Sequence, residues 1–210
     1  DQFTRPDGSI TFEQVEQRFS DYIGPVIRDR RGGGGGDLIT QMVNGQVEGR
    51  DLSHEEAENL CTQALVGGLD TVVNLLGFVF SHLAQDGETR RALVADPGKL
   101  DDAILEFLRR FPVVSDSREV IGEVEFGGVT LHPRDMVMAS TVPIALSDKS
   151  NPDPMEFRLG RQARRQYIFG KGSHTCPGAH LARAELKLVL EEWLARIPEF
   201  HLARDTVLSF

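Results

Sequence analysis

Apolar residues recur at helical spacing over much of the chain. The first such stretch follows a capping box formed by Thr11 and Gln14, and one apolar face then predicts a helix that ends near Arg30. Five consecutive glycines at 32–36 end this helix, and a natural flexible loop or an engineered linker would give the same pattern. A short helix is expected over 38–43.

A second capping box, Ser53 and Glu56, opens the longest helical pattern, which continues to about residue 85. About 32 residues at ~1.5 Å each give a helix of roughly 48 Å. Residues 64–83 are the best candidate for a membrane span, but Asp70, Asn74 and His82 lie within them and make insertion costly. We therefore expect a buried helix of a soluble protein.

The remaining patterns predict shorter elements. A helix is expected over 88–95, and a β-hairpin over 123–131 would turn at Gly127 and Gly128 before a strand at 136–142. The helix beginning at Pro97 is expected to bury Leu100, Ile104, Leu105, Leu108 and Phe111. A last helix, from about 181, carries Leu186, Val189, Leu190, Trp193, Leu194 and Ile197 at helical spacing. The fold class is mainly α with a small β portion.

Composition narrows the classes of function. The 210 residues suffice for one domain, and a net charge of -9 argues against nucleic acid as the main partner. Cys61 and Cys176 are the two cysteines, so a disulfide is formally possible, but a reducing cytoplasm suits so few cysteines better. The first residues show no signal-peptide pattern.

Cys176 is the strongest candidate for chemistry. Gly170, Gly172 and Gly178 surround it and would let the backbone adopt positive φ, and the following helix would favour a thiolate at its N-terminus. Such a cysteine could ligate a metal, act as a nucleophile with His174 or His180, or be a buried thiol. Zinc is a weaker rival, because His180 would be its one clear further ligand.

The string Phe169-x-x-Gly172-x-His174-x-Cys176-x-Gly178 resembles the cysteine loop of the cytochrome P450 family, the haem-thiolate monooxygenases. The resemblance implies haem b (iron protoporphyrin IX) with Cys176 as the axial iron ligand. It also implies that Arg118 and His174 bind the haem propionates, with Asp116 assisting. The other residues expected at the cofactor are Gly67, Phe169, Gly170 and Gly178.

The middle of the long helix breaks local rules, because paired glycines weaken a helix and Asp70 is costly among apolar residues. Asp70 could simply pair with an arginine. The Thr71 hydroxyl, however, can reach the carbonyl of Gly67, four residues back, where a pocket could admit O2. This segment resembles the oxygen-binding motif of the P450 family, which implies that Thr71 hydrogen-bonds bound dioxygen and that Asp70 relays protons.

Glu106 and Arg109 stand three apart on one helix and could be an ordinary surface ion pair. With Arg161 they resemble the Glu-Arg-Arg network of the family, whose role would be to hold the cysteine loop in shape. An excess of basic residues around that loop would suit an acidic [2Fe–2S] ferredoxin, itself reduced by an NADH-dependent reductase. These residues are Arg158, Arg161, Arg164, Arg165, Lys171 and Arg183.

Residues 5–9, 43–47, 65–74 and 196–200 are most similar to the camphor-hydroxylating bacterial members of the family. This favours a compact, terpenoid-like substrate in a pocket lined by Gln63, Val66 and Val114. Gln63 is polar where those members carry an apolar residue, so the substrate cannot be carried over. The resemblance covers only the later part of the family's domain, so residues 1–210 are expected to be its C-terminal part, lacking the N-terminal half and the final strands. We expect such a chain alone to expose apolar surface, bind haem poorly and be inactive.

The resulting hypothesis is a cytoplasmic haem monooxygenase that inserts one oxygen atom from O2 into a C–H bond of a small hydrophobic substrate. Two rivals use the same haem, namely a non-catalytic sensor or storage protein and a peroxide-driven enzyme. The intact Asp70 and Thr71 pair counts against both, because neither rival needs protons delivered to bound dioxygen.

Overall fold

The computed structural model describes residues 11–162 and 164–207, and the chain divides into two compact units, 1–69 and 70–210. The division falls inside one long helix, α3 (His54–Gln85). Residues 5–9, which resemble the camphor-hydroxylating enzymes, lie outside the described residues. The elements are mainly helices with a small β portion, which confirms the predicted fold class.

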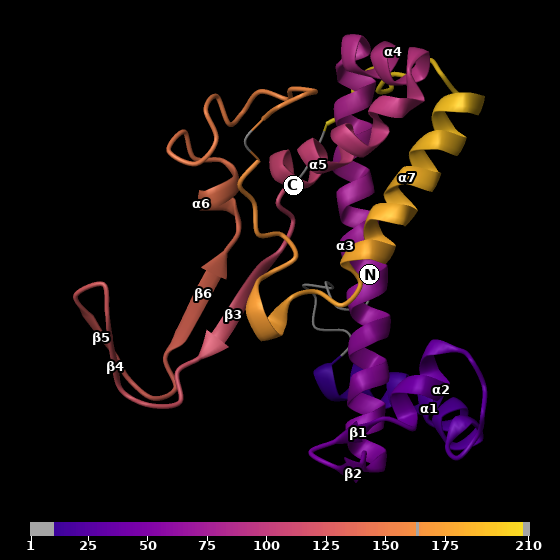
Figure 1. The fold of residues 1–210 in the computed structure, drawn as a ribbon, viewed down its shortest axis with the longest axis vertical. Coiled ribbons are helices and arrows are strands. Elements are labelled where there is room, and N and C mark those ends of the chain that lie inside the picture. The colour runs from indigo at the N-terminus through magenta and orange to yellow at the C-terminus, as the bar shows by residue number, and fades with distance from the viewer. Residues whose placement is uncertain (1–10, 163, 208–210) are drawn as a thin grey trace. The chain divides into compact units, whose positions relative to one another are not determined.

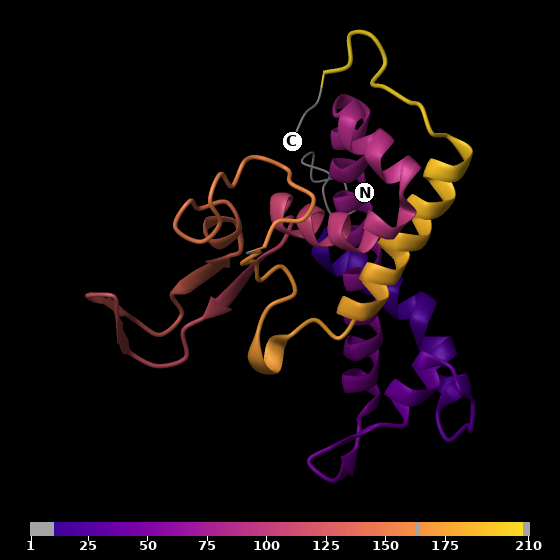
Figure 2. The ribbon, with the colours of Figure 1, turned by 45° about the horizontal axis from the view of Figure 1, so that its top comes forward.

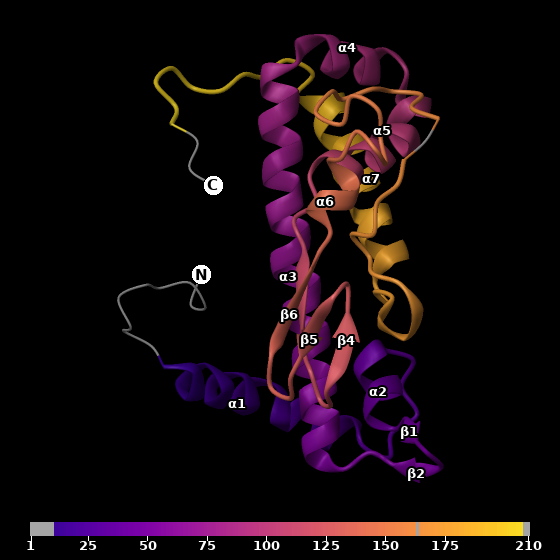
Figure 3. The ribbon, with the colours of Figure 1, turned by 90° about the vertical axis from the view of Figure 1, so that its left-hand side faces the viewer.

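The first unit contains α1 (Phe12–Arg30), α2 (Leu38–Val43) and the first part of α3, as predicted. A two-stranded antiparallel ladder, β1 (Gln46–Val47) with β2 (Arg50–Asp51), follows α2 (Figure 3). Its small core consists of Ile23, Ile27, Val43, Ala57 and Cys61. Because this core is apolar, burial raises the pKa of the Cys61 thiol.

Both predicted capping boxes form. Thr11 Oγ1 accepts from the Gln14 amide at 3.3 Å, while the Thr11 amide donates to Gln14 Oε1 at 3.0 Å. At the start of α3 the Ser53 amide donates to Glu56 Oε2 at 2.8 Å, and the Glu56 amide donates to Ser53 Oγ at 3.1 Å. These bonds satisfy backbone donors that a helix cannot pair internally, so local sequence fixes where both helices begin.

The second unit packs four helices around one apolar core. The carboxyl end of α3 joins α4 (Gly87–Ala95), a 3₁₀ turn (Pro97–Lys99), α5 (Leu100–Arg110) and α7 (Ala179–Arg196). Figures 1 and 2 show α7, in yellow, lying against α4 and α5. Buried residues of this core are Leu75, Val79, Leu83, Leu93, Leu100, Ala103, Ile104, Phe107, Leu108, Ile168, Leu186, Leu190 and Leu194.

The prediction for the buried face of α5 is partly wrong. Leu105 is 37% exposed, whereas Phe107 is fully buried. The buried line runs through Leu100, Ile104 and Phe107, at steps of three and four residues, and Leu105 lies about 100° away from Ile104 around the helix. The last helix, expected from about residue 181, begins at Ala179 as α7. Ile197, the last residue of its apolar series, is the C-cap and is 41% exposed.

The β portion consists of two antiparallel pairs. β4 (Val124–Phe126) and β5 (Val129–Leu131) form the predicted hairpin, whose turn residues Gly127 and Gly128 have φ of 61° and 82°. β3 (Ser115–Glu119) pairs with β6 (Met136–Ser140), and Figure 1 shows the hairpin continuing outward from this pair. β3 was not predicted, because its sequence Ser-Asp-Ser-Arg-Glu lacks apolar alternation. The predicted strand 136–142 is two residues too long, because Val142 begins the short helix α6 (Val142–Ala145).

The sequence predicts that the long helix α3 is buried, but only part of it is. Leu75, Val79 and Leu83 are buried, but Leu69 is 59% and Val73 66% exposed. By length and composition alone α3 could cross a membrane, although core helices of soluble proteins satisfy the same criterion. The exposed apolar residues agree with the expectation that this chain leaves apolar surface uncovered.

Candidate functional site

The loop that carries Cys176 closes on itself through backbone hydrogen bonds. The Gly170 amide donates to the Tyr167 carbonyl at 2.8 Å, and the Cys176 amide donates to the Phe169 carbonyl at 2.8 Å. Between them, a 3₁₀ turn (Gly172–His174) is closed by the Thr175 amide on the Gly172 carbonyl at 3.1 Å. The loop therefore has a defined shape before any ligand is considered.

Two of the three glycines that would let the backbone adopt positive φ do so. Gly170 has φ of 70°, and a Cβ there would lie 2.8 Å from the His174 carbonyl oxygen. Gly172 has φ of 71° with nothing within 4 Å of such a Cβ. Gly178 does not use this freedom, because it has φ of -85° and is the N-cap of α7. What Gly178 provides is space, because its Cβ would lie 3.8 Å from Cys176 Sγ.

The Cys176 thiol is exposed and is not in a disulfide. It precedes the first residue of α7 by three positions, which confirms the predicted placement just before a helix N-terminus. Within the described part of the chain, no group of three or more His, Cys, Asp and Glu side chains could hold a metal. Zinc at Cys176 and His180 would therefore lack a third ligand from the described residues, whereas a metal that brings its own ligands would not need one.

Glu106, Arg109 and Arg161 lie together in the second unit, and none is a surface residue. Arg109 donates to Glu106 from Nε at 2.9 Å and from Nη2 at 2.8 Å, while Arg161 Nε donates to Glu106 Oε1 at 2.9 Å. The Glu106 and Arg109 side chains are 0% exposed. Burial acts to raise the pKa of Glu106, but the hydrogen bonds from Arg109 and Arg161 outweigh it and the pKa is lowered.

The arginines of this network also hold backbone. Arg109 donates to the carbonyls of Ala145, Pro154 and Glu156 at 3.1, 2.7 and 3.0 Å. Arg161 donates to Pro152 at 2.6 Å and to Glu156 at 2.8 Å. The network thus connects α5 to the irregular segment that leads into the cysteine loop.

Sequence reasoning missed Asn151, which is fully buried. Its Nδ2 donates to the carbonyls of Ile144, Ala145 and Arg165 at 3.0, 3.1 and 2.8 Å, and its Oδ1 accepts from the Arg165 amide at 2.8 Å. An Asn before a proline is typical of an exposed turn, so no signal in the sequence could have indicated this role.

Arg118 and Asp116, assigned to the haem propionates, lie two apart on β3 and so on one face of the strand. Both are exposed, and Arg118 Nη2 lies 3.8 Å from Asp116 Oδ2. His174 is exposed in the 3₁₀ turn of the cysteine loop. The contacts of the described residues join Arg118 to Asp116 but not to His174.

The residues assigned to the oxygen and substrate side are divided between the units. Gln63, Val66 and Gly67 belong to the first unit, and apart from the backbone of α3 itself no atom of the described residues lies within 4 Å of a Cβ at Gly67. Asp70 is exposed and Thr71 half-buried at the start of the second unit. Val114, also in the second unit, is half-buried against its core.

The predicted basic surface is partly neutralised. Arg158 pairs with Glu156 and Asp153, Arg161 pairs with Glu106, and Arg164 pairs with Asp102. Of the other basic residues, Arg165 and Lys171 are exposed, and the Arg183 guanidinium lies 4.9 Å from the Phe169 ring centroid. Sequence showed the basic excess but not its carboxylate partners, which come from distant positions or from turns.

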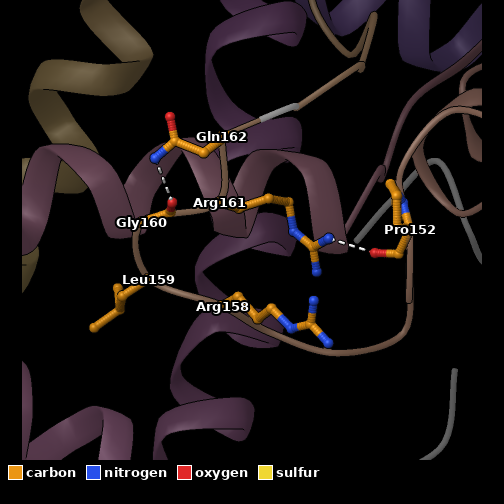
Figure 4. Close-up of a pocket in the computed structure, with 6 residues that line it drawn as sticks. All are labelled: Pro152, Arg158, Leu159, Gly160, Arg161 and Gln162. Carbon is orange, nitrogen blue, oxygen red and sulfur yellow. Dashed lines mark hydrogen bonds between the residues drawn. The ribbon is translucent and has the colours of Figure 1, made fainter.

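A hollow of about 370 Å³ lies beside the network, lined by Pro152, Arg158, Leu159, Gly160, Arg161 and Gln162. Figure 4 shows Arg161 directed at the Pro152 carbonyl and the Gln162 amide at the Gly160 carbonyl. Its lining includes none of the residues assigned to substrate or haem.

Comparison with known proteins decides the family. Residues 99–201 match the model of the family described as Cytochrome P450. The chain in the crystal structure of CYP101J2 is 59% identical to this one, with a TM-score of 0.88. The match covers 98% of this chain and 51% of the CYP101J2 chain. The chain belongs to the cytochrome P450 family. This P450 chain is also 40% identical to CYP101C1, with a TM-score of 0.90 over 98% of this chain and 52% of that chain.

A curated relative gives the same result. Probable cytochrome P450 127A1 of Sinorhizobium fredii is 38% identical over 176 residues, which are 81% of this P450 chain and 41% of that protein. The chain thus spans about half the length of the curated relatives it matches. The predicted partial P450 fold is confirmed by these similarities.

The cysteine loop fits the haem that the family implies. The thiol is exposed, the loop is closed by its own backbone, and Gly178 leaves space beside the sulfur. Haem iron brings four nitrogen ligands of its own, so one protein thiolate suffices on this side. The residues present therefore suit haem better than zinc.

Proposed function

We propose that this P450 chain supplies the thiolate-ligand part of a haem-dependent monooxygenase that inserts one oxygen atom from O2 into a C–H bond. The observation that carries the proposal is the exposed Cys176 thiol on a loop closed by its own hydrogen bonds just before α7. Because the chain spans about half of its relatives, residues 1–210 would be the C-terminal part of one domain.

Haem b, when bound, would activate O2, and the Cys176 thiolate would donate electron density to its iron. Arg118 and His174 would bind the two propionates, and the exposed Asp116 beside Arg118 would orient its guanidinium. Phe169, Gly170 and Gly178 would hold the ligand loop against the macrocycle. Gly67 would leave room on the helix that carries the proton-delivery residues.

Thr71 and Asp70 would deliver protons during O2 activation. The Thr71 hydroxyl would supply a hydrogen-bond donor on the O2 side of the site, and Asp70, which is exposed in this chain, would exchange protons with solvent. Glu106, Arg109 and Arg161 would have no catalytic role. Their buried network would hold the segment before the cysteine loop.

The substrate would be a small, hydrophobic, terpenoid-like molecule in a pocket including Gln63, Val66 and Val114. Electrons would come from a [2Fe–2S] ferredoxin and its NADH-dependent reductase, docking near Arg165 and Lys171, two exposed residues of the basic surface. We place the protein in the cytoplasm, with no part for a membrane or nucleic acid.

The optical spectrum of the reduced, CO-bound full-length protein tests thiolate ligation. We expect a strongly red-shifted Soret band that is lost in Cys176→Ser and kept in Cys61→Ala, because Cys61 lies in a separate apolar core. A wild-type spectrum without the shift would return Cys176 to the zinc or free-thiol interpretations.

Proton delivery is tested by Thr71→Ala in the full-length protein. We expect NADH to be consumed with much less product per NADH, because the site would lose the Thr71 hydroxyl as a hydrogen-bond donor in proton delivery. Unchanged coupling would count against proton delivery by Thr71, and absence of any turnover in the wild type would favour a sensor or storage protein.

A further inference from the structure

The face of α5 that carries Glu106 also carries a second carboxylate, Asp102, one helical turn earlier. Asp102 Oδ2 accepts from the Gly160 amide at 2.5 Å, and its Oδ1 accepts from Arg164 Nη2. These partners lie 58 and 62 residues further along the chain. Asp102 therefore fixes a long-range contact that local sequence does not impose.

Arg164 lies between the two carboxylates of α5. Its side chain is 15% exposed, its Nη2 binds Asp102, and its Nε lies 3.5 Å from Glu106 Oε2. That Nε is buried without a hydrogen-bond partner. Arg164 thus depends on Asp102 for its charge-assisted hydrogen bond.

Charge balance makes Asp102 a more important partner of Arg164 than Glu106 is. Glu106 already faces the guanidinium groups of Arg109 and Arg161, and Arg164 adds a third positive charge. With Asp102 present, two carboxylates oppose three guanidinium groups; without it, Glu106 alone would do so. An unbalanced positive charge in a partly buried cluster is costly.

Arg164 lies in the segment that leads directly into the cysteine loop, so its pair with Asp102 affects how the chain enters that loop. Arg165 follows at once and is held by Asn151, and Tyr167, two residues later, accepts the bond that closes the cysteine loop. Asp102, Glu106 and Asn151 thus hold successive points of the segment that enters this loop.

The geometry points to the Asp102–Arg164 pair as a latch, next to the Glu106 network, that positions the entry of the cysteine loop and so the Cys176 thiol. Its effect on haem ligation rests on the proposed function. Asp102 and Arg164 are positioning residues, because neither contacts Cys176 itself.

The test is hydrogen exchange over residues 164–176 in the full-length haem-loaded protein, read beside its reduced CO spectrum. We expect Asp102→Asn to speed exchange about tenfold, the loss that follows from one charge-assisted hydrogen bond. The red-shifted fraction of the spectrum should fall with it. Asp101→Asn is the matched control, since it removes the same charge from the same helix turn but only an exposed contact to Lys187.

Two further variants separate a latch from general destabilisation. Arg164→Gln should have a smaller effect than Asp102→Asn, and adding it to Asp102→Asn should slow exchange again, because it removes the unbalanced charge. Arg164→Lys keeps the positive charge but loses the planar guanidinium, so it should retain part of the protection from exchange. This variant still tests the latch if Asp102→Asn does not fold.

Equal exchange in Asp102→Asn and Asp101→Asn would overturn the latch, as would a double variant whose effects simply add. If exchange responds as expected but the wild type shows no red-shifted band, the latch stands and the proposed haem function fails. If the band is present and exchange does not respond, the haem function stands and the latch fails.

Discussion

The segment around the cysteine loop and the Gly67–Thr71 segment of α3 were both identified from short motifs, yet they differ in how far this chain completes them. Around the loop, Glu106 and Asn151 are fully buried and their side chains are bonded within the chain. In α3, Asp70 is exposed, and apart from the backbone of α3 itself no atom of the described residues lies within 4 Å of a Cβ at Gly67. A motif can therefore be recognised in the sequence whether or not the described residues around it enclose it.

The largest expected effect comes from the buried network. Glu106→Gln in the full-length protein would leave the buried charges of Arg109 and Arg161 uncompensated and should lower the free energy of unfolding by about 3–5 kcal/mol. Urea unfolding followed by circular dichroism measures this loss. Glu192→Gln is the control, because its pair with Arg196 is more than 60% exposed and should contribute below about 1 kcal/mol. Similar losses of unfolding free energy in the two variants would mean that the buried Glu106 network stabilises the protein no more than an exposed ion pair does.

A smaller effect is expected inside the cysteine loop, where two glycines with the same φ differ in surroundings. Gly172→Ala should cost about 1–2 kcal/mol from positive φ alone. Gly170→Ala should cost about 1–3 kcal/mol more, because its Cβ would overlap the His174 carbonyl oxygen. Thermal unfolding of the two full-length variants compares them directly. Equal melting temperatures would mean that the loop is not as tightly closed as its hydrogen bonds indicate.

The smallest effect is expected at the packed carboxyl end of α3. Burial among Phe107, Phe111 and Phe157 lowers the pKa of His82, and Arg110 adds to this while Asp86 opposes it. The unfolded chain then binds the proton more readily, so the stability that neutral His82 contributes is present above about pH 6.5 and is lost as the pH falls below that value.

Unfolding free energies measured from pH 7.5 to pH 5 test this sign. The wild type should lose stability towards pH 5, and His82→Gln should lose less over the same range. A steeper loss in the variant would place the charged form of His82, paired with Asp86 at 3.5 Å, in the folded state.

Much of the fold was predictable because its signals are local. Thr11 and Ser53 mark the first turns of their helices through hydrogen bonds that span three residues. The Gly127 and Gly128 turn likewise sets its hairpin by backbone geometry alone. The exposure of the Leu105 side chain was not predicted from the sequence, because it depends on which side of α5 packs against the core.

The sequence by itself determined the family and the helices and indicated the cysteine that we propose as the iron ligand, since these follow from spacing along the chain. Only the tertiary structure revealed Asn151, the Asp102–Arg164 contact and the pairing of the basic residues. Those features join positions that are far apart along the chain or lie in turns without a periodic pattern. Their energies come from burial and charge balance, which exist only once the chain has folded.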